Sequence, residues 1–161
     1  MDPVHHDYLA KILTAQVYDV AIESPLELAS LLSRRLDNRL LLKREDMQAV
    51  FSFKLRGAYN KMAHLDPAVR ARGVIAASAG NHAQGVALAA HKLACPAVIV
   101  MPVTTPRIKI DAVERLGAEV VLHGDAYDEA QAHADQMATQ QHLTFVHPYD
   151  DPEAVIPAND W

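Results

Sequence analysis

Four short runs of apolar residues recur through the second half of the chain, separated by helical patterns. The runs cover 74–77, 97–100, 119–122 and 144–146, at intervals of about 20 to 25 residues. The gaps between them hold helical patterns over 81–93, 106–116 and 126–140. Strands that are apolar throughout and alternate with helices are typical of a parallel sheet covered on both faces. The pattern therefore predicts a three-layer α/β domain with about four parallel strands.

The first third of the chain has a different pattern. Apolar positions predict one amphipathic helix within 8–20 and a second over 28–36, followed by a strand at 40–42. Ser24-Pro25 has the pattern of a cap and a first-turn proline for the second helix. We expect a boundary near 46–52, which divides the chain into an N-terminal segment (1–51), an α/β domain (52–150) and an aberrant tail (151–161).

Signals for helix ends support the elements of the α/β part. Ser52 can cap a helix from about Phe53 to His64, and Thr105-Pro106 and Asp125 can start the two later helices. Gly117 is a stop signal after the helix over 106–116. The single cysteine, Cys95, lies just before an apolar run, so we expect a reduced and packed thiol.

Composition and charge exclude several classes of protein. Half of the 161 residues are hydrophobic and 22% are charged, which is usual for a folded chain. The net charge of -5 has the wrong sign for a general nucleic-acid binder, so no nucleic-acid partner is expected. No signal peptide begins the sequence, and its apolar runs are too short for a membrane helix. We expect a cytoplasmic protein without a membrane partner, and no metal site, because the nine histidines lack metal-ligand spacing.

One candidate for chemistry is the segment Ser52-Phe53-Lys54-Leu55-Arg56-Gly57-Ala58. A lysine in the first turn of a helix is electrostatically unfavourable, because the helix dipole already places positive charge there. A lysine that forms a covalent bond with a carbonyl compound needs a lowered pKa, which a nearby cation such as Arg56 favours. The alternative, which the segment by itself favours, is a solvated lysine on a helix.

A second candidate is the segment Ser78-Ala79-Gly80-Asn81-His82-Ala83-Gln84-Gly85, where a predicted strand leads into a helix. Small residues and free N–H groups at this position can hold an anion. The alternative is a tight turn in which Asn81 only caps the helix. Val86-Ala87 stands where a P-loop needs Lys-Ser/Thr, and the sequence contains no G-x-G-x-x-G dinucleotide motif.

Together the two segments resemble the fold-type II family of pyridoxal 5'-phosphate enzymes, and most closely its threonine ammonia-lyase branch. The resemblance also includes Ser24-Pro25-Leu26, the stretch Leu41 to Asp46 and His147-Pro148-Tyr149-Asp150, and covers about 8–156. It implies a small parallel-sheet domain of that family, with N-terminal helices that belong to an incomplete large domain.

The resemblance also implies roles for individual residues. Lys54 would bind the cofactor pyridoxal 5'-phosphate covalently and act as the catalytic base, and Phe53 would pack against the cofactor ring. Asn81 would hydrogen-bond the 3'-oxygen of the ring. The substrate carboxylate would be held by the loop residues Ser78, Ala79, Gly80, Asn81 and His82. The substrate would be L-threonine, or L-serine. With threonine, the reaction would be the first step of isoleucine biosynthesis. The resemblance also implies a homo-oligomer, because family members form one.

The sequence departs from the family after Pro152. Family members continue with a glycine-rich loop that holds the cofactor phosphate, whereas this chain reads Pro157-Ala158-Asn159-Asp160-Trp161. We therefore expect a truncated and inactive copy of a threonine ammonia-lyase. Two alternatives stay open: a non-catalytic fragment that keeps the fold of the small domain, and a serine dehydratase or serine racemase of the same fold.

Overall fold

The computed structural model describes residues 8–155, and its centre is a four-stranded parallel sheet. The strands are β3 (Val74–Ala77), β4 (Ala97–Met101), β5 (Glu119–Leu122) and β6 (Thr144–Phe145), in the order β5-β4-β3-β6. Every residue of β3 and β4 is buried. The two central strands are therefore covered on both faces, as their continuous apolar runs predicted.

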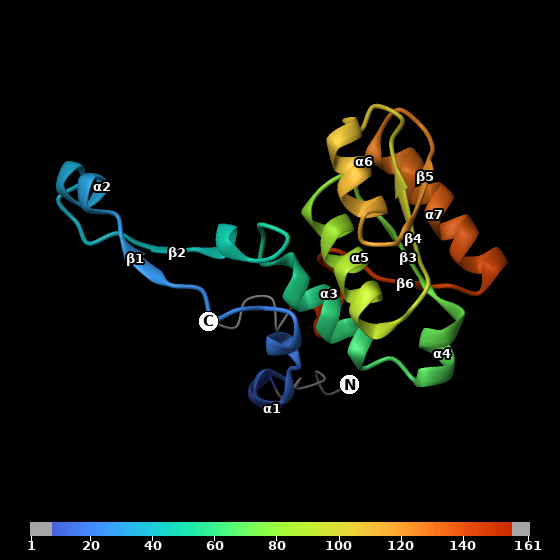
Figure 1. Ribbon diagram of the computed structural model, residues 1–161, viewed down its shortest axis with the longest axis horizontal. Helices are drawn as coiled ribbons and strands as arrows, with labels where there is room; N and C mark the ends of the chain where they lie inside the picture. Colours follow the sequence, from blue (N-terminus) through green and yellow to red (C-terminus); the bar gives the residue numbers. More distant parts are fainter. Residues whose placement is uncertain (1–7, 156–161) are drawn as a thin grey trace, which may run out of the picture.

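Helices cover the two faces of the sheet in three layers (Figure 1). On one face lie α3 (Lys54–Ala63), α5 (Asn81–Leu93) and α6 (Arg107–Glu114), which share a core with Ala76 and Ile99. On the other face α7 (Tyr127–Gln141) packs Ala130 and Ala134 against Ile75 and the strand residues beside it. The small alanine side chains allow α7 to approach the sheet closely. The predicted three-layer α/β fold is confirmed.

The remaining short elements surround this body. They are α1 (Tyr8–Thr14), η1 (Val17–Asp19), η2 (Glu45–Met47), α4 (Pro67–Arg72) and α8 (Pro152–Val155). The segment around η1 is fastened to α3, because the Tyr59 hydroxyl donates to Asp19 at 2.9 Å and the Gln16 N–H donates to the Asn60 side chain at 3.1 Å. These two contacts attach the beginning of the described chain to the helix that begins at Lys54.

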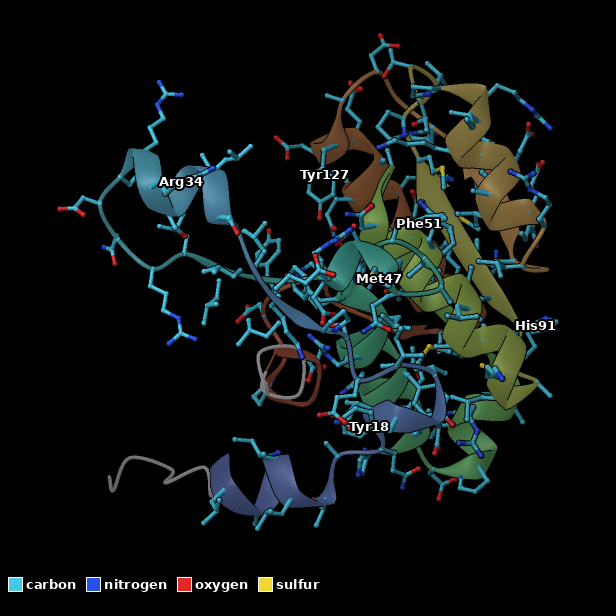
Figure 2. The ribbon with its side chains drawn as sticks, turned by 60° about the vertical axis from the view of Figure 1, so that its left-hand side comes forward. Tyr18, Arg34, Met47, Phe51, His91 and Tyr127 are labelled. Atoms are coloured by element: carbon cyan, nitrogen blue, oxygen red, sulfur yellow. The ribbon has the colours of Figure 1, made fainter. Side chains whose placement is uncertain are left out.

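A hairpin, which we call the arm (26–43), projects from the body (Figure 1). It consists of β1 (Leu26–Leu28), α2 (Ser30–Arg35) and β2 (Leu41–Lys43), and β1 pairs antiparallel with β2. Figure 2 shows Arg34 on α2 pointing away from the body, whereas Met47 and Phe51 lie where the arm joins it. The exposed apolar side chains of the arm are Leu26, Leu28, Leu31, Leu32, Leu36, Leu41 and Leu42.

Two predictions for the N-terminal third are wrong in their details. The helix predicted over 8–20 ends at Thr14, and the 3-10 turn η1 replaces its second half. Ser24-Pro25 does not cap a helix, because β1 follows it and α2 begins only at Ser30. Leu26 and Leu28 also fit the two-residue period of a strand, and pairing with Lys43 and Leu41 decides in favour of the strand.

The strands and helices of the α/β part agree with their predictions to within three residues at each end, but two caps differ. Pro106, not Thr105, directly precedes α6, and its position carries no side-chain cap bond. At α7 the Glu129 carboxylate accepts the N–H groups of Asp125 and Ala126 at 2.6 and 3.2 Å. Gly117 has a φ of +86°, which suits its predicted role as a stop.

Other predictions concern single residues or the tail. Ser52 accepts the Lys54 N–H at 3.3 Å, close to its predicted role. Cys95 is buried and free, and burial raises the pKa of its thiol. Most of the predicted tail, including Trp161, lies outside the described residues, and the division at 46–52 stays a prediction. Within 8–155 no helix combines the length and apolar composition that spanning a bilayer needs.

Candidate functional site

The order of the strands creates a switch point between β3 and β6. From β3 the chain passes through α5 to β4 and through α6 to β5, and then crosses the opposite face through α7 to reach β6 on the other side of β3. Open α/β sheets bind ligands outside the carboxyl ends of the strands where the winding reverses. The loops that follow β3 and β6 therefore form the candidate site.

The loop after β3 is the predicted anion-binding segment. Ser78 donates its N–H to the Val100 carbonyl at 3.1 Å, and its hydroxyl accepts the Gly80 N–H at 3.2 Å. A Cβ added at Gly80 would meet no atom within 4 Å, so open space lies in front of this part of the backbone. Ser78, Ala79 and Gly80 are half-buried, and Asn81 is exposed at the start of α5. The N-terminal turn of a 13-residue helix thus faces this space with its N–H groups.

Lys54 reaches the loop after β6 from the first position of α3. Its Nζ donates to the Pro148 carbonyl at 2.7 Å and lies 5.5 Å from the centroid of the Phe53 ring. The side chains of Lys54 and Phe53 are half-buried. The amine is therefore held at the switch point, beside an aromatic ring and 94 positions in sequence from the carbonyl that binds it.

His82 binds the same loop from α5. Its side chain is 6% exposed, and its Nε2–H donates to the Val146 carbonyl at 2.8 Å. Burial lowers the pKa of His82 to about 4; the bond to Val146 opposes the shift, and the charges of Lys54 and His147 add to it. The imidazole is neutral at pH 7. Because Val146 and Pro148 lie two residues apart, their contacts bring Lys54 and His82 to the same short loop.

Gly85 sets the distance between the two helices of the site. A Cβ at this position would lie 3.0 Å from the Lys54 carbonyl oxygen and 3.2 Å from the Leu55 nitrogen. Most side chains would therefore push the beginning of α3 away from α5. Glycine is needed here for close approach, since the residue lies inside a helix and its backbone is ordinary.

The structure thus brings Lys54, Phe53 and the 78–82 loop to one edge of the sheet; the roles given to them stay predictions. Sequence analysis did not identify the carbonyl groups of Val146 and Pro148 as partners of the site. His147-Pro148-Tyr149-Asp150 carries no chemistry by itself, and only the strand order shows that this loop lies beside β3. In the described part of the chain, three or more His, Cys, Asp or Glu side chains nowhere gather in a way that could hold a metal ion.

Comparisons with known proteins agree with this fold. A family model described as "Pyridoxal-phosphate dependent enzyme" matches residues 17–157. The chain is 64% identical over 149 residues to "Threonine dehydratase biosynthetic, chloroplastic" of Arabidopsis thaliana, covering 92% of this chain and 25% of that protein. It is 60% identical over 153 residues to "L-threonine dehydratase biosynthetic IlvA" of Burkholderia multivorans, covering 93% and 30%.

Solved structures give the same result for the fold. The processed form of threonine deaminase isoform 2 from Solanum lycopersicum superposes with a TM-score of 0.90 at 59% identity, covering 93% of this chain and 41% of that one. Maize serine racemase superposes with a TM-score of 0.87 at 26% identity, covering 92% and 46%. The chain thus spans a quarter to less than a third of the two relatives' length, and less than half of the two solved chains.

Proposed function

Because the chain belongs to the family of pyridoxal-phosphate dependent enzymes, we propose that it carries the lysine-bearing part of a threonine ammonia-lyase active site. The reaction converts L-threonine to 2-oxobutanoate and ammonia, the first step of isoleucine biosynthesis. One observation carries the proposal: the Lys54 amine is held at the switch point of the sheet, against the loop that His82 also binds. The cytoplasmic location stays a prediction, because the relatives include a chloroplastic protein.

The residues present at the site suit the cofactor. A half-buried primary amine can bind an aldehyde, and an aromatic ring beside it can pack against a pyridine ring. The open space in front of Gly80 lies at the start of α5, where backbone N–H groups favour anions. When bound, pyridoxal phosphate supplies an electron sink for the pair left behind as the substrate loses its Cα proton.

Each residue of the candidate site then has a proposed role. The loop residues Ser78, Ala79, Gly80, Asn81 and His82 hold the substrate carboxylate mainly through the N–H groups at the start of α5, because the Ser78 N–H and the His82 side chain already bind Val100 and Val146. Asn81 donates to the 3'-oxygen of the cofactor ring. Phe53 packs against one face of that ring. Lys54 removes the Cα proton of the substrate with its amine. The β-hydroxyl takes up the proton that Lys54 removed and leaves as water, and a second water releases the amino group as ammonia.

The relatives favour threonine over serine as the substrate. The two threonine dehydratases are 64% and 60% identical to this chain, whereas the serine racemase with the same fold is 26% identical. We also propose that these 161 residues alone do not turn over threonine. They span a quarter to less than a third of the relatives' length, and the cofactor phosphate needs several charge-assisted hydrogen bonds to be held firmly.

Covalent trapping tests the proposed role of Lys54. The purified chain is mixed with limiting pyridoxal phosphate and reduced with borohydride, and the modified peptides are mapped. We expect the label at Lys54 in excess over the exposed Lys109 of α6. Lys54→Arg should abolish this label, and Lys109→Arg should leave it unchanged. A label mainly on Lys43 or Lys61 would contradict the assignment.

The same preparation tests the lack of turnover. Saturating cofactor is added with threonine or with serine, and 2-oxo acids are measured. We expect no product from either amino acid. Turnover near 1 per second, at the low end of the usual enzymatic range of roughly 1–1,000 per second, would show that the chain is sufficient by itself.

A further inference from the structure

The two ends of the arm meet at the Glu45 carboxylate, which pairs with Arg56 of α3. Ser24 lies just before β1, and its hydroxyl donates to the Glu45 carboxylate at 2.5 Å. Glu45 lies just after β2, and its second oxygen accepts from Arg56 at 2.9 Å. Gln48 donates to the same carboxylate at 3.3 Å. Its side-chain amide also donates to the Ile22 carbonyl at 2.8 Å and accepts from the Ile22 N–H at 2.9 Å. We call Ser24, Glu45, Gln48 and Arg56 the arm-root cluster.

The arm-root cluster is buried and includes a full ion pair. Arg56 is 3% exposed and Glu45 is 8% exposed, and Ser24 and Gln48 are also buried. Taking two charges out of water costs so much that a buried pair often stabilises a fold no better than apolar side chains of similar size. A gain in the stability of the fold is therefore a poor explanation for the presence of the Glu45–Arg56 pair. A pair with fixed partners does define one geometry, and the helix that it fixes is the one that carries Lys54.

The position of Arg56 in α3 links the cluster to Lys54. Successive helical residues are rotated by about 100°, so two residues later the side chain leaves from nearly the opposite face of the helix. Arg56 thus holds the first turn from one side, and the contact of Lys54 with Gly85 limits it on another. With side chains reaching about 5–6 Å from the axis, a rotation of roughly 10° moves their ends by about 1 Å. The cluster can therefore set where the amine lies.

We propose that the arm-root cluster positions Lys54, by fixing the rotation of the first turn of α3 through the buried Glu45–Arg56 pair. Its four residues act through the helix and do not touch the reacting atoms. This inference rests on the proposed function of Lys54. It adds that the arm, whose two ends meet at the cluster, is connected to the lysine. In Figure 2, the labelled Met47 and Phe51 lie where the arm joins the body.

Glu45→Gln tests the proposal, with Glu27→Gln as its matched control. Glu27 makes an ion pair of 2.7 Å with Arg44, just after the arm, but both side chains of this pair are partly exposed. The readout is the ratio of borohydride-trapped label at Lys54 to label at Lys109. We expect the ratio to fall about tenfold in Glu45→Gln, because a misplacement of roughly 1 Å can cost up to about 100-fold in a positioned reaction. Glu27→Gln should leave the ratio unchanged.

A double variant separates positioning from stability. Glu45→Gln with Arg56→Met removes both charges, so thermal unfolding should return towards that of the unmodified chain. The trapping ratio should stay low, because the fixed geometry is still lost. A ratio that recovers with stability, or one that Glu45→Gln leaves unchanged in a folded chain, overturns the proposal.

A milder change decides the case if these variants do not fold. Ser24→Ala removes one hydrogen bond to Glu45 and leaves the ion pair in place. We expect the ratio to fall about threefold, less than in Glu45→Gln, because the ion pair still holds the first turn and the amine is displaced less. An unchanged ratio overturns the proposal. Failure of the proposed function looks different, because the unmodified chain would then show no excess of label at Lys54.

Discussion

At the scale of single residues, His82 makes the stability of the fold depend on pH. Burial lowers its pKa to about 4 in the folded chain, against an ordinary value of 6.5. Between these values the unfolded chain binds a proton that the folded chain does not, so stability falls as the pH falls. The contribution of the neutral ring is therefore complete above pH 6.5 and is lost progressively towards pH 4. The shift corresponds to about 3 kcal/mol.

His82→Gln should remove this part of the pH dependence. Glutamine can still donate to the Val146 carbonyl, but it does not titrate. We expect the free energy of unfolding of the variant, from urea titrations between pH 7 and pH 4.5, to change less with pH than that of the unmodified chain. His91→Gln is the control, because His91 is exposed near the end of the same helix (Figure 2). Equal slopes for all three proteins would contradict the role given to His82.

At the scale of elements, the contact between α3 and α5 depends on Gly85. Gly85→Ala places a Cβ 3.0 Å from the backbone of Lys54, which cannot move without shifting the helix. Overpacking of this kind costs about 1–3 kcal/mol, and the helix preference of alanine returns up to about 1 kcal/mol. We expect a net loss of stability, measured as a lower unfolding midpoint. Gly80→Ala is the control, because its Cβ would meet no atom within 4 Å.

The elements of the α/β part could be predicted because their signals are local. Val74–Ala77 and Ala97–Met101 are apolar throughout, and Asn81–Leu93 has a helical period, although Gly80 precedes it without a side-chain cap bond. Leu26–Leu28 could not be assigned in this way, since three residues fit both periods and the partner strand lies outside the local window. The 3-10 turn at Glu45–Met47 was missed for a similar reason: its Glu45 is fixed by contacts with Ser24 and Arg56.

At the scale of the whole molecule, the arm presents apolar side chains without cover from the body. Leu28 and Leu31 are 52% and 75% exposed, and five further leucines of the arm are also exposed. Exposed apolar surface of this kind favours association. The chain should therefore associate with increasing concentration, as measured by sedimentation velocity. Leu28→Lys with Leu31→Lys should reduce this association.

A control on the body makes this prediction specific to the arm. Ile108 is 73% exposed on α6, away from the arm. Leu28→Lys alone is the matched comparison, because Ile108→Lys adds the same single charge elsewhere and should leave the association almost unchanged. If the two substitutions reduce association equally, net charge is the cause and the arm is not.

The candidate site was predictable in its residues but not in its arrangement. Lys54 and the 78–82 loop stand out as segments with chemistry, and the resemblance to a family assigns them roles. Their meeting with the loop after β6 follows from the reversal of winding between β5 and β6, which no local pattern contains. The same holds for the arm-root cluster, because Ser24 and Arg56 have no sequence signal that joins them.

The long reach of the Lys54–Pro148 contact has a consequence for the order of folding. Val74 pairs with Ala97 through a short connection, whereas the contacts of Lys54 with Pro148 and of His82 with Val146 close loops of 94 and 64 residues. Closing a longer loop costs more chain entropy, and contacts distant in sequence slow folding. The β3–α5–β4 unit can therefore form before β6 adds to it. The amine reaches its place only when the last strand docks, so a chain stalled before that step has most of its secondary structure and no site.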